Sequence, residues 1–469
     1  MIFRDWLKEL DYTLLQGSVD VETEDVIYDS RKAAPGKVFV AMKGIRVDGH
    51  SFIPQVLKAG VRVLVTERPV EEELKNSGLS EDELKQVTVV MVEEGRHALA
   101  LLSAARFDHP AKKLVMIGVT GTKGKTTTTH MIRAILLAAG KKVGMIGTTG
   151  TVIGDVVTPT LNTTPESYEL HQAFAQMVEA GCEYAVMEVS SQGIKMHRTD
   201  GLYFNYAIFT NISPDHIGPG EHADFEEYLY YKTRLLNMCG IGLVNKDDEH
   251  APQIIKAANC ELYTYSEESK EADFVASDIR YVSQPDFVGT EFHISGKYDM
   301  EVRLGIPGLF NVVNALAAVS VCSFLGLDQA RISHALENIR VNGRMEIVYT
   351  SERCTVLVDY AHNAVSMESL LSTLRDYKPK RLVCVFGCGG NRSKDRRYSM
   401  GEIGGKMADL SIITADNSRY EKVEDIIADI RGSIEKTGGK FIEIPDRREA
   451  IRYSILHAQP GDMVAVIGK

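Results

Sequence analysis

The stretch Gly118-Val-Thr-Gly-Thr-Lys-Gly-Lys-Thr-Thr-Thr-Thr129 decides the fold of this chain. It follows the apolar run 114–117, which predicts a buried parallel strand, and it precedes 130–137, whose apolar residues have helical spacing. A strand, a glycine-rich loop and a helix in this order form a phosphate-binding loop, whereas the competing interpretation is an ordinary strand-to-helix turn. The stretch therefore predicts an α/β domain that binds a nucleotide.

The residue types of this loop fit phosphate chemistry. Gly121 and Gly124 let backbone N–H groups approach phosphate oxygens, and the start of the helix adds positive potential. Lys125 can reach the terminal phosphates, and the Thr126 hydroxyl can bind Mg²⁺. The usual G-x-x-x-x-G-K-[ST] spacing would place glycine at the position of Val119, so the loop is a shorter variant.

Composition places the chain among soluble globular proteins. Its 469 residues predict roughly three domains, and 44% hydrophobic with 25% charged residues is ordinary for such proteins. A formal net charge of −11 disfavours a nucleic-acid binder or an anionic-membrane binder, because both usually need a basic face. We therefore expect neither nucleic acid nor membrane as a partner.

Segments that direct export are not evident either. Residues 1–10 mix four charges with apolar residues, which predicts an amphipathic helix and not a secretory signal. No apolar run approaches the ~20 residues of a membrane span. The seven cysteines are scattered without a CxxC pair, which is typical of a reducing compartment. We expect a cytoplasmic protein that works as a monomer.

The first segment, residues 1–110, predicts a small α/β domain. Strands are expected at 61–66 and 87–92, with one polar helix at 71–85 between them. Ser30 and Arg31 lie on a loop before the Pro35-Gly36 turn. From the residues alone, this pair is more simply explained as capping and solvating that loop.

The central segment, residues 111–340, alternates strands and helices, which predicts a parallel sheet covered on both faces. Ligands of such sheets bind at the carboxyl ends of the strands. Three polar groups follow predicted strands there: the hydroxyl-rich segment 161–165, Glu188, and His216, which is followed by Lys232 on a helix predicted at 224–237. Each could be an ordinary solvated side chain, but together with the loop they predict a metal-assisted phosphoryl-transfer site.

Ordered motifs along nearly the whole chain make a resemblance specific. They are Asp29-Ser-Arg31, Gly121-Thr-Lys-Gly-Lys-Thr126, Asn162-Thr-Thr-Pro165, Glu188-Val-Ser-Ser191, Thr210-Asn-Ile-Ser-Pro-Asp-His216, Gly308-Leu-Phe-Asn-Val-Val-Asn314, Gly343-Arg-Met-Glu346, Asp359-Tyr-Ala-His362 and Gly387-Cys-Gly-Gly390. In this order they resemble the Mur ligase family, and within it the branch that adds the third residue of the peptidoglycan stem peptide. Folylpolyglutamate synthetases share the loop and the lysine, but not the whole series of motifs.

The resemblance implies roles for the loop and for the residues around it. The ATP-binding loop would be formed by Gly121, Thr122, Lys123, Gly124, Lys125, Thr126 and Thr127. Thr126, Glu188, His216 and Lys232 would surround Mg²⁺. Lys232 matches a lysine that is carbamylated in the family, which turns an ammonium into a carboxylate able to bind a second Mg²⁺. The catalytic residues implied are Lys125, Glu188, His216, Lys232 and Arg344.

The remaining implied contacts divide among three ligands. The nucleotide would also meet Asn314, Arg344, Asp359 and Tyr360. The nucleotide-sugar dipeptide would meet Ser30, Asn162, Thr163, Thr164, Ser190 and Arg198. The incoming amino acid would meet Arg392, Asp416, Asn417 and Arg419, because an arginine can bind the distal carboxylate of diaminopimelate in a bidentate fashion. The domains implied are a UDP-sugar domain at 1–110, an ATP domain at 111–340 and a Rossmann-like amino-acid domain at 341–469.

Several positions depart from the resembled pattern. Ser418 replaces a proline, Lys422-Val423 replace Asp-Pro, and Met196 stands where a glutamine is frequent. The sequence ends at Lys469, where the resembled sequences continue with Gly-His-Glu, so either that segment is missing or the amino acid is recognised differently. These departures affect the choice of amino acid more than the chemistry.

The resemblance implies an ATP- and Mg²⁺-dependent ligase that adds meso-diaminopimelate to UDP-N-acetylmuramoyl-L-alanyl-D-glutamate through an acyl phosphate. Its partners would be that dipeptide and a diamino acid. Three alternatives stay open: addition of lysine or another amino acid, a folylpolyglutamate synthetase-like ligase, and a non-catalytic relative that only binds nucleotide. Lys125, Glu188, His216 and Lys232 together favour an active enzyme.

Overall fold

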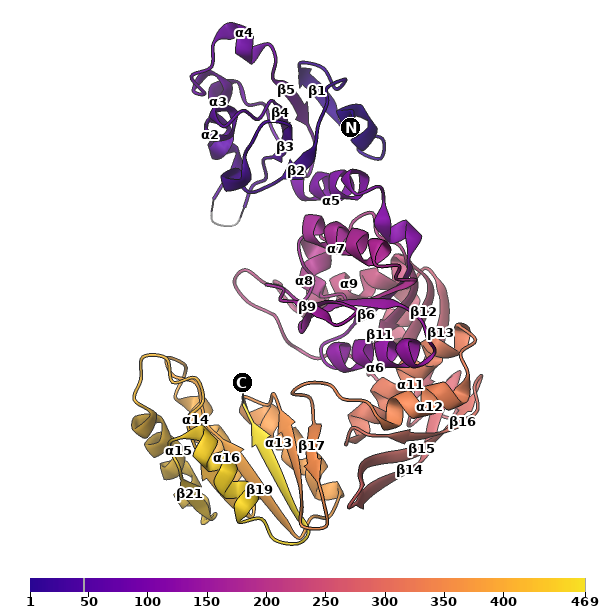
Figure 1. Ribbon diagram of the computed structural model, residues 1–469, viewed down its shortest axis with the longest axis vertical. Coiled ribbons are helices and arrows are strands. Elements are labelled where there is room, and N and C mark those ends of the chain that lie inside the picture. The colour runs from indigo at the N-terminus through magenta and orange to yellow at the C-terminus, as the bar shows by residue number, and fades with distance from the viewer. Residues whose placement is uncertain (45–46, 469) are drawn as a thin grey trace. The chain divides into compact units, whose positions relative to one another are not determined.

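The computed structural model describes residues 1–44 and 47–468 (Figure 1). The chain divides into two compact units, one formed by 1–129 with 140–264 and the other by 130–139 with 265–469. Helices and parallel strands alternate in both units, so the predicted α/β class is confirmed. Among the described residues, no helix is both long enough and apolar enough to span a bilayer.

The N-terminal part of the first unit is a mostly parallel sheet with the strand order β1-β5-β4-β3-β2. Its elements are α1 (Phe3–Trp6), β1 (Thr13–Gln16), β2 (Asp25–Ile27), η1 (Ser30–Lys32), β3 (Lys37–Val40), η2 (Gly49–Phe52), α2 (Ile53–Lys58), β4 (Val63–Thr66), α3 (Glu71–Lys75), α4 (Glu81–Leu84), β5 (Thr88–Met91) and α5 (Gly95–Arg106). Alternate residues of β3 enter different cores: Val38 and Val40 pack with residues of α5, and Phe39 with residues of α2. Helices therefore cover both faces of this sheet (Figure 1).

Two helices predicted in this region are wrong in extent. The predicted helix 71–85 is two short helices, α3 and α4, because Gly78 adopts a φ of +74° between them and Ser80 caps the second. The predicted amphipathic helix 1–10 shortens to α1, whose Phe3 and Trp6 are buried. The Asp29 side chain accepts a hydrogen bond from Arg31 N, which caps η1, and it also pairs with the Arg31 guanidinium. The Arg31 hydrogen bond lowers the pKa of Asp29 to about 2.

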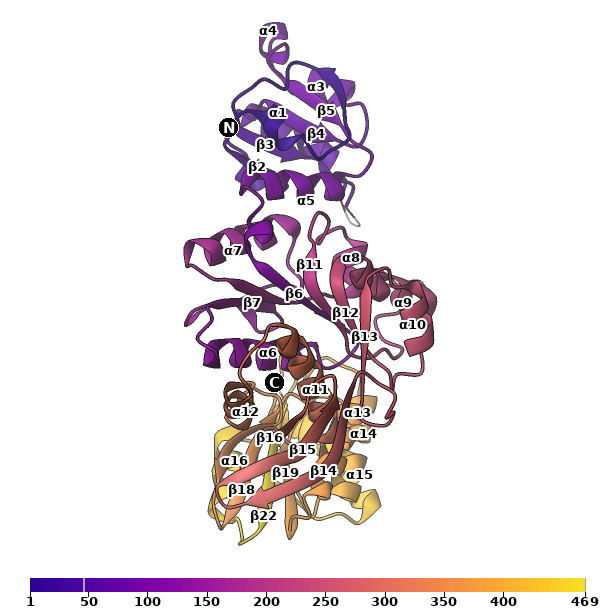
Figure 2. The ribbon, with the colours of Figure 1, turned by 90° about the vertical axis from the view of Figure 1, so that its right-hand side faces the viewer.

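A second sheet carries the glycine-rich loop, and most of it lies in the first unit (Figure 2). Residues 130–138 of the helix that follows the loop belong to the second unit. The elements of this region are η3 (Pro110–Lys113), β6 (Val115–Thr120), α6 (Lys125–Ala138), β7 (Val143–Gly147), β8 (Gly150–Ile153), β9 (Val156–Thr158), α7 (Ser167–Glu179), β10 (Tyr184–Glu188), α8 (Ser191–Lys195), β11 (Phe204–Phe209), α9 (Phe225–Thr233), η4 (Arg234–Asn237), β12 (Cys239–Asn245), α10 (Ala251–Ala257) and β13 (Glu261–Ser266). Strands β12, β11, β6, β10 and β7 are parallel neighbours in that order, whereas β8 and β9 are antiparallel additions. Strands β6, β10 and β11 therefore end side by side, at one edge of the sheet.

The phosphate-loop helix begins earlier than predicted. The apolar spacing indicated a helix at 130–137, but α6 starts at Lys125. The four threonines 126–129 hide its first turn from a hydrophobic pattern, because they are polar and β-branched although all four are buried. The helix therefore starts directly after the glycine loop, as anion binding at a helix N-terminus requires.

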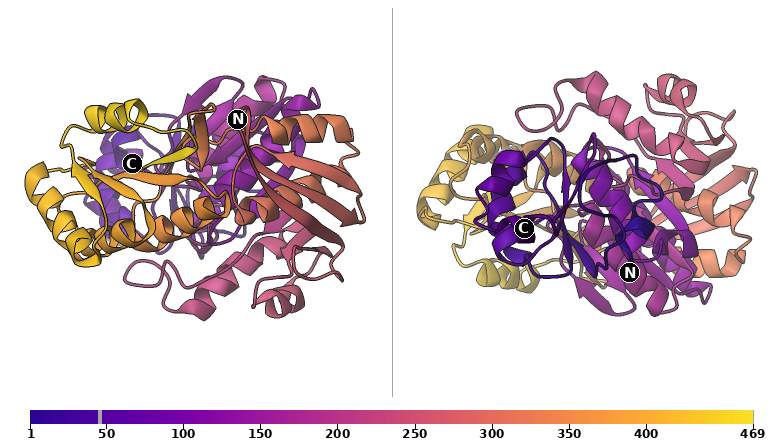
Figure 3. Two further views of the ribbon diagram at one scale, coloured as in Figure 1. Left: turned by 90° about the horizontal axis from the view of Figure 1, so that it is seen from below. Right: turned by 90° about the horizontal axis from the view of Figure 1, so that it is seen from above.

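The second unit contains an antiparallel part and a six-stranded sheet (Figures 2 and 3). The first part has β14 (Phe274–Gln284), β15 (Phe287–Gly296), β16 (Met300–Leu304), α11 (Leu309–Phe324) and α12 (Gln329–Glu337). The second has β17 (Glu346–Thr350), β18 (Cys354–Asp359), α13 (Ala364–Asp376), β19 (Arg381–Phe386), α14 (Asp395–Met407), β20 (Leu410–Ile413), α15 (Val423–Thr437), β21 (Phe441–Glu443), α16 (Arg447–Leu456) and β22 (Asp462–Ile467). Its strand order is β17-β18-β22-β19-β20-β21, parallel except at β17, as a Rossmann-like domain requires. The antiparallel strands 274–304 were not anticipated in a central segment predicted to be parallel.

Buried His171 on α7 makes the stability of the fold sensitive to acid. Its ring is 1% exposed, packs edge-on against Phe174, and finds no hydrogen-bond partner for either nitrogen among the described residues. Burial lowers the pKa of His171 to about 3. Below its ordinary value of about 6.5, the unfolded chain takes up a proton that the folded chain refuses, so stability falls between pH 6.5 and pH 3.

We expect His171→Leu to remove this acid sensitivity. Between pH 7 and pH 5 the native chain should lose about 2 kcal/mol of unfolding free energy that the variant keeps. This is the free energy of the roughly one and a half pH units between the ordinary pKa of histidine and pH 5. Urea denaturation at the two pH values measures the difference. His334→Gln, at an exposed histidine on α12, is the control, and an equal acid loss in native and His171→Leu proteins would contradict the prediction.

Candidate active site

The glycine loop is held in shape by the strand next to it. Gly121 has a φ of +143°, and a Cβ there would collide with the Thr210 hydroxyl that follows β11. Thr122 N donates to the Asn211 carbonyl at 2.8 Å, and Lys123 N donates to the Asn211 side-chain oxygen at 2.9 Å. Lys125 Nζ donates to the carbonyl oxygens of Gly121 and Thr122. The loop is therefore fixed before a ligand arrives, as electrostatic preorganisation requires.

Glu188, at the end of β10, faces the first turn of α6. Its Oε1 accepts a hydrogen bond from Thr126 Oγ1 at 3.0 Å and another from Thr148 N at 2.9 Å. The Thr148 hydroxyl lies 3.3 Å from the second carboxylate oxygen, and Glu188 is 1% exposed. Oxygen donors gathered in this way suit a hard cation such as Mg²⁺. The structure thus brings together two of the residues that the sequence predicted for metal binding.

Lys232 of α9 lies beneath the same loop. Its Nζ donates to the Gly121 carbonyl at 2.7 Å and lies 4.7 Å from the centre of the Tyr228 ring, and the residue is 2% exposed. Burial, together with the charge of Lys125, lowers the pKa of Lys232 well below its ordinary value. A buried lysine held as a neutral amine is nucleophilic, which is the form that carbamylation needs.

His216 lies at the edge of this group. It adopts a φ of 54° in an exposed loop, its Nδ1 is 3.1 Å from Glu221, and its ring centre lies 6.1 Å from that of Tyr228. Tyr228 in turn shares a 3.1 Å hydrogen bond with the Thr122 hydroxyl. His216 therefore reaches the loop through an aromatic neighbour, and no direct contact of its ring with Glu188 appears among the described residues.

The predicted dipeptide-binding residues are only partly gathered. Thr164 Oγ1 donates a hydrogen bond to the Glu188 carbonyl and accepts one from Ser190 N at 2.9 Å. The Arg198 guanidinium donates to the Thr164 carbonyl at 3.0 Å. Thr163 lies 3.2 Å from Thr148, whereas Asn162 is exposed and Ser30 lies in η1 of the N-terminal sheet. Thr163, Thr164, Ser190 and Arg198 therefore lie next to Glu188 and Thr148, whereas Asn162 and Ser30 make no hydrogen bond to this group within the described part of the chain.

Sequence reasoning missed three residues that organise this region. Thr148 fixes Glu188, Tyr228 covers Lys232, and His222 is fully buried with its Nε2 2.9 Å from Ser191 Oγ. Burial lowers the pKa of His222. Thr148 directly follows β7, at the carboxyl end of a parallel strand, where ligands of such sheets bind. Tyr228 stands four residues before Lys232, in the Tyr-x-x-x-Lys spacing of the resembled family, whereas no comparable signal marks His222.

Of the four residues predicted to contact the nucleotide, Arg344, Asp359 and Tyr360 lie around one loop of the second unit, and Asn314 lies on α11. Asp359 accepts hydrogen bonds from Met345 N and Ala361 N, both at 2.8 Å, and burial raises its pKa. The Arg344 guanidinium lies 5.1 Å from the Tyr360 ring centre. Asn314 of α11 is buried and donates to Asn311 at 3.3 Å. Asp359 therefore positions the segment that carries Arg344.

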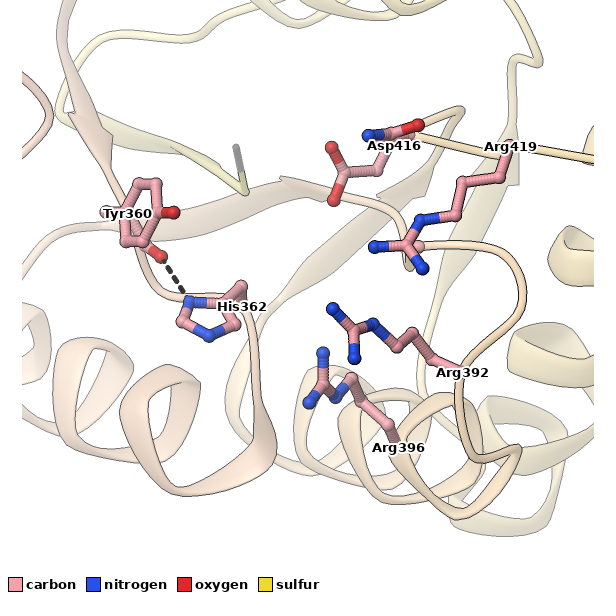
Figure 4. A pocket seen from close by; sticks show the side chains of 8 residues that line it. Tyr360, His362, Arg392, Arg396, Asp416 and Arg419 are labelled. Carbon is pink, nitrogen blue, oxygen red and sulfur yellow. Dashed lines mark hydrogen bonds between the residues drawn. The ribbon is translucent and has the colours of Figure 1, made fainter. Parts of the chain in front are cut away.

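A cavity of about 220 Å³ in the second unit collects the residues predicted to bind the amino acid. It is lined by Tyr360, His362, Gly389, Arg392, Arg396, Asp416, Asn417 and Arg419. Figure 4 shows the guanidinium groups of Arg392, Arg396 and Arg419 directed into one space, with Asp416 near Arg419. Arg396 was not predicted. The cavity suits a ligand that has a carboxylate for the arginines and an ammonium for Asp416.

A buried arginine fixes the two loops that form this cavity. Arg397 is 1% exposed and donates to Glu421 at 2.7 Å and to Asp429 at 2.9 Å, while Glu421 also accepts Asn391 N. Gly390 N donates to the Asn417 carbonyl at 2.9 Å, and a Cβ on Gly390 would collide with the Ser418 carbonyl. These contacts hold Ser418 in place without the proline of the resembled pattern.

A glycine loop between β6 and α6, with a carboxylate and a lysine beside it, defines a phosphate-binding enzyme of the P-loop type. Three family models match the chain: the "Mur ligase family, catalytic domain" over 23–107, the "Mur ligase middle domain" over 119–322 and the "Mur ligase, glutamate ligase domain" over 343–469. The chain belongs to the Mur ligase family, and it is a ligase with three α/β domains.

Relatives match along the whole chain. One from Caldanaerobacter subterraneus subsp. tengcongensis is 38% identical over 99% of this chain and 93% of its own length, and one from Clostridium perfringens is 37% identical over 100% and 94%. Both are named UDP-N-acetylmuramoyl-L-alanyl-D-glutamate–2,6-diaminopimelate ligase. A solved structure with that name is 29% identical, has a TM-score of 0.74, and the match covers 95% of this chain and 89% of that one. A folylpolyglutamate synthase from Mycobacterium tuberculosis (18% identity, TM-score 0.60, 80% and 92% covered) shares the fold.

Proposed function

We propose that this chain uses ATP to join meso-diaminopimelate to UDP-N-acetylmuramoyl-L-alanyl-D-glutamate. The observation that carries the proposal is the arginine cavity of the second unit, where Arg392, Arg396 and Arg419 share one space with Asp416. Diaminopimelate has a carboxylate and an ammonium at each end, so one end can pair with these groups while the other end presents its amine. The relatives bearing this name support the same substrates.

The proposed reaction has two steps. The γ-carboxylate of the D-glutamyl residue attacks the γ-phosphate of ATP, which forms an acyl phosphate and releases ADP. The amine of diaminopimelate then attacks the acyl carbon, loses a proton, and expels inorganic phosphate as the amide forms. Loop N–H groups of Gly121–Thr127 and the Lys125 ammonium stabilise charge on the transferred phosphoryl group. The Arg344 guanidinium supplies a second positive charge beside the phosphates of the nucleotide.

Thr126 and Glu188 fit Mg²⁺ through their oxygen donors. His216, whose ring centre lies 6.1 Å from that of Tyr228, would supply a nitrogen donor. Lys232 fits only after carbamylation, because an ammonium cannot bind a cation. Bound Mg²⁺ would neutralise phosphate charge during the transfer. We assign these four residues to metal binding.

The remaining assignments complete the proposal. Asn314, Arg344, Asp359 and Tyr360 contact the nucleotide; Ser30, Asn162, Thr163, Thr164, Ser190 and Arg198 contact the dipeptide; Arg392, Asp416, Asn417 and Arg419 contact the amino acid. We keep the domain boundaries near residues 110 and 340. We place the reaction in the cytoplasm, where ATP is made, and the free cysteines suit a reducing compartment. A single chain is the working unit, since it supplies every assigned residue.

One experiment tests the proposal against its alternatives. Purified chain is given ATP, Mg²⁺ and UDP-N-acetylmuramoyl-L-alanyl-D-glutamate with a panel of amino acids, and both ADP release and amide product are measured. Product with diaminopimelate supports the proposal. Ligation of glutamate to a folate instead would favour the folylpolyglutamate synthetase alternative, and nucleotide binding without any product would favour a non-catalytic relative.

We expect diaminopimelate to be used at least about 100-fold better than lysine, measured as kcat/KM, because lysine leaves the cavity arginines without their carboxylate. In Arg419→Ala the ratio should shrink toward one, mainly through loss of diaminopimelate use. Lys406→Ala, which removes an exposed cation of α14 that does not line the cavity, is the control and should keep the native ratio. Equal use of both amino acids by the native chain would refute the assignment, as would undiminished selectivity in Arg419→Ala.

A further inference from the structure

Two histidines and an aspartate meet in the first unit, away from the phosphate loop. His97 lies in the first turn of α5, while His197 and Asp200 lie in the turn that follows α8. The Nδ1 atoms of His97 and His197 lie 2.6 Å and 2.8 Å from the same oxygen, Oδ2 of Asp200. The two imidazole rings are 6.3 Å apart and nearly perpendicular. Residues as far as 103 positions apart in sequence thus bring three donor atoms together.

These donors have the chemistry of a metal site. One donor atom from each of the three side chains lies within 4.8 Å of the others. Zinc holds imidazole nitrogen and carboxylate oxygen at about 2.0–2.2 Å, which puts neighbouring ligands about 3.4 Å apart in a tetrahedron. The hydrogen-bonded atoms are slightly closer than that, so an entering cation has to part them by less than about 1 Å. All three side chains are partly exposed, which permits that movement.

The surroundings fix the backbone of both elements. Helix α5 packs its apolar face into the core that contains Val38 and Val90. The turn after α8 is closed by His197 N to the Ile194 carbonyl at 3.0 Å and by Arg198 N to the Gly193 carbonyl at 2.9 Å. The three donors are therefore presented from anchored backbone, while their side chains remain adjustable.

Asp200 is suited to be the anionic ligand. Burial alone would raise its pKa, but hydrogen bonds from His197 and His97 outweigh burial and lower the pKa to about 2. The carboxylate is held by both imidazoles at a single oxygen atom. It accepts two N–H groups at one oxygen, and a single divalent cation could replace both of those protons.

We propose that His97, His197 and Asp200 bind one divalent transition metal such as Zn²⁺, with the fourth position left to water. Two imidazoles and one carboxylate favour Zn²⁺ over Mg²⁺ and Ca²⁺, which prefer oxygen ligands throughout. The bound metal joins α5 to the turn after α8. Arg198, in that turn, is assigned to the dipeptide and pairs with Glu166 at 2.7 Å, so the metal stiffens a segment next to the substrate.

Zinc binding by metal-stripped full-length chain tests the proposal, in the presence of excess Mg²⁺ to fill sites near the phosphate loop. His97→Gln removes the imidazole ligand that α5 supplies. Asp200→Asn removes the negative charge but keeps an oxygen that can accept a hydrogen bond. Both should bind the zinc equivalent at least about 100-fold more weakly than the native chain. His334→Gln, an exposed helical histidine elsewhere, should bind as the native chain does.

Two further readouts keep the result independent of folding and of the seven cysteines. Zn²⁺ should raise the melting temperature of the native chain but not of the two ligand variants, whose melting without metal should stay close to native. Co²⁺ in the native chain should show d–d absorption without a thiolate band. Equal zinc binding in all four proteins would overturn the proposal, as would a loss confined to Asp200→Asn or cobalt bound through thiolate.

Discussion

Lys125→Ala should lower kcat for amide formation by about 1000-fold or more while leaving the fold intact. Lys125 opens α6 and its Nζ lies at the glycine loop, where it donates to two loop carbonyls. A cation in this position stabilises charge that develops on the transferred phosphoryl group, and removal of such a cation acts mainly on the chemical step. The loss should therefore fall on kcat more than on KM for the dipeptide or for diaminopimelate.

Steady-state kinetics with ATP as the varied substrate measure this effect, and thermal melting checks the fold. Lys112→Ala removes an equally long cation from an exposed ion pair with Glu9 and should keep native turnover. Near-native turnover in Lys125→Ala would show that the loop only binds nucleotide and that phosphoryl transfer depends on other groups.

The sequence predicts that Gly121, Thr126 and Glu188 lie close together, because their clustering follows a local rule. Polar residues that follow buried strands gather at one edge of a parallel sheet, and β11, β6 and β10 are indeed neighbours. Gly121, Thr126 and Glu188 could therefore be selected from patterns alone. Lys232 needed the family resemblance, because a lysine on a helix has no pattern of its own until burial beneath the loop is known.

Other features could not be predicted because they depend on tertiary contacts. The start of α6 at Lys125 was hidden by a run of threonines, and the break near Gly78 depended on one left-handed backbone angle. Arg396 lies in a helix whose sequence marks it as a surface residue, yet its guanidinium enters the cavity that Arg392 and Arg419 also line. The partnership of His97 with Asp200 joins residues 103 positions apart, a separation that no local pattern covers.

Lys232→Ala should be almost inactive, with kcat lowered about 1000-fold or more, because we assign the carbamate of Lys232 to a Mg²⁺ ligand. The amine is well prepared for that modification. It is 2% exposed, its nearest hydrogen-bond partner is the Gly121 carbonyl at 2.7 Å, and burial beside Lys125 lowers its pKa well below the ordinary value. A neutral amine can add to carbon dioxide, and the product is an anion where the ammonium would have repelled the metal.

Chemical rescue distinguishes this role from a structural one. Acetate or another short carboxylate can enter the space left in Lys232→Ala and supply the missing oxygens, so activity should rise with its concentration. Lys232→Arg keeps a cation that cannot be carbamylated, and it should be inactive and insensitive to acetate. In the native chain, ¹³C-labelled bicarbonate should give one carbamate signal that Lys232→Ala lacks. A native chain without that signal, together with a Lys232→Ala variant that acetate leaves inactive, would mean that Lys232 supports the loop only as an amine donating to the Gly121 carbonyl.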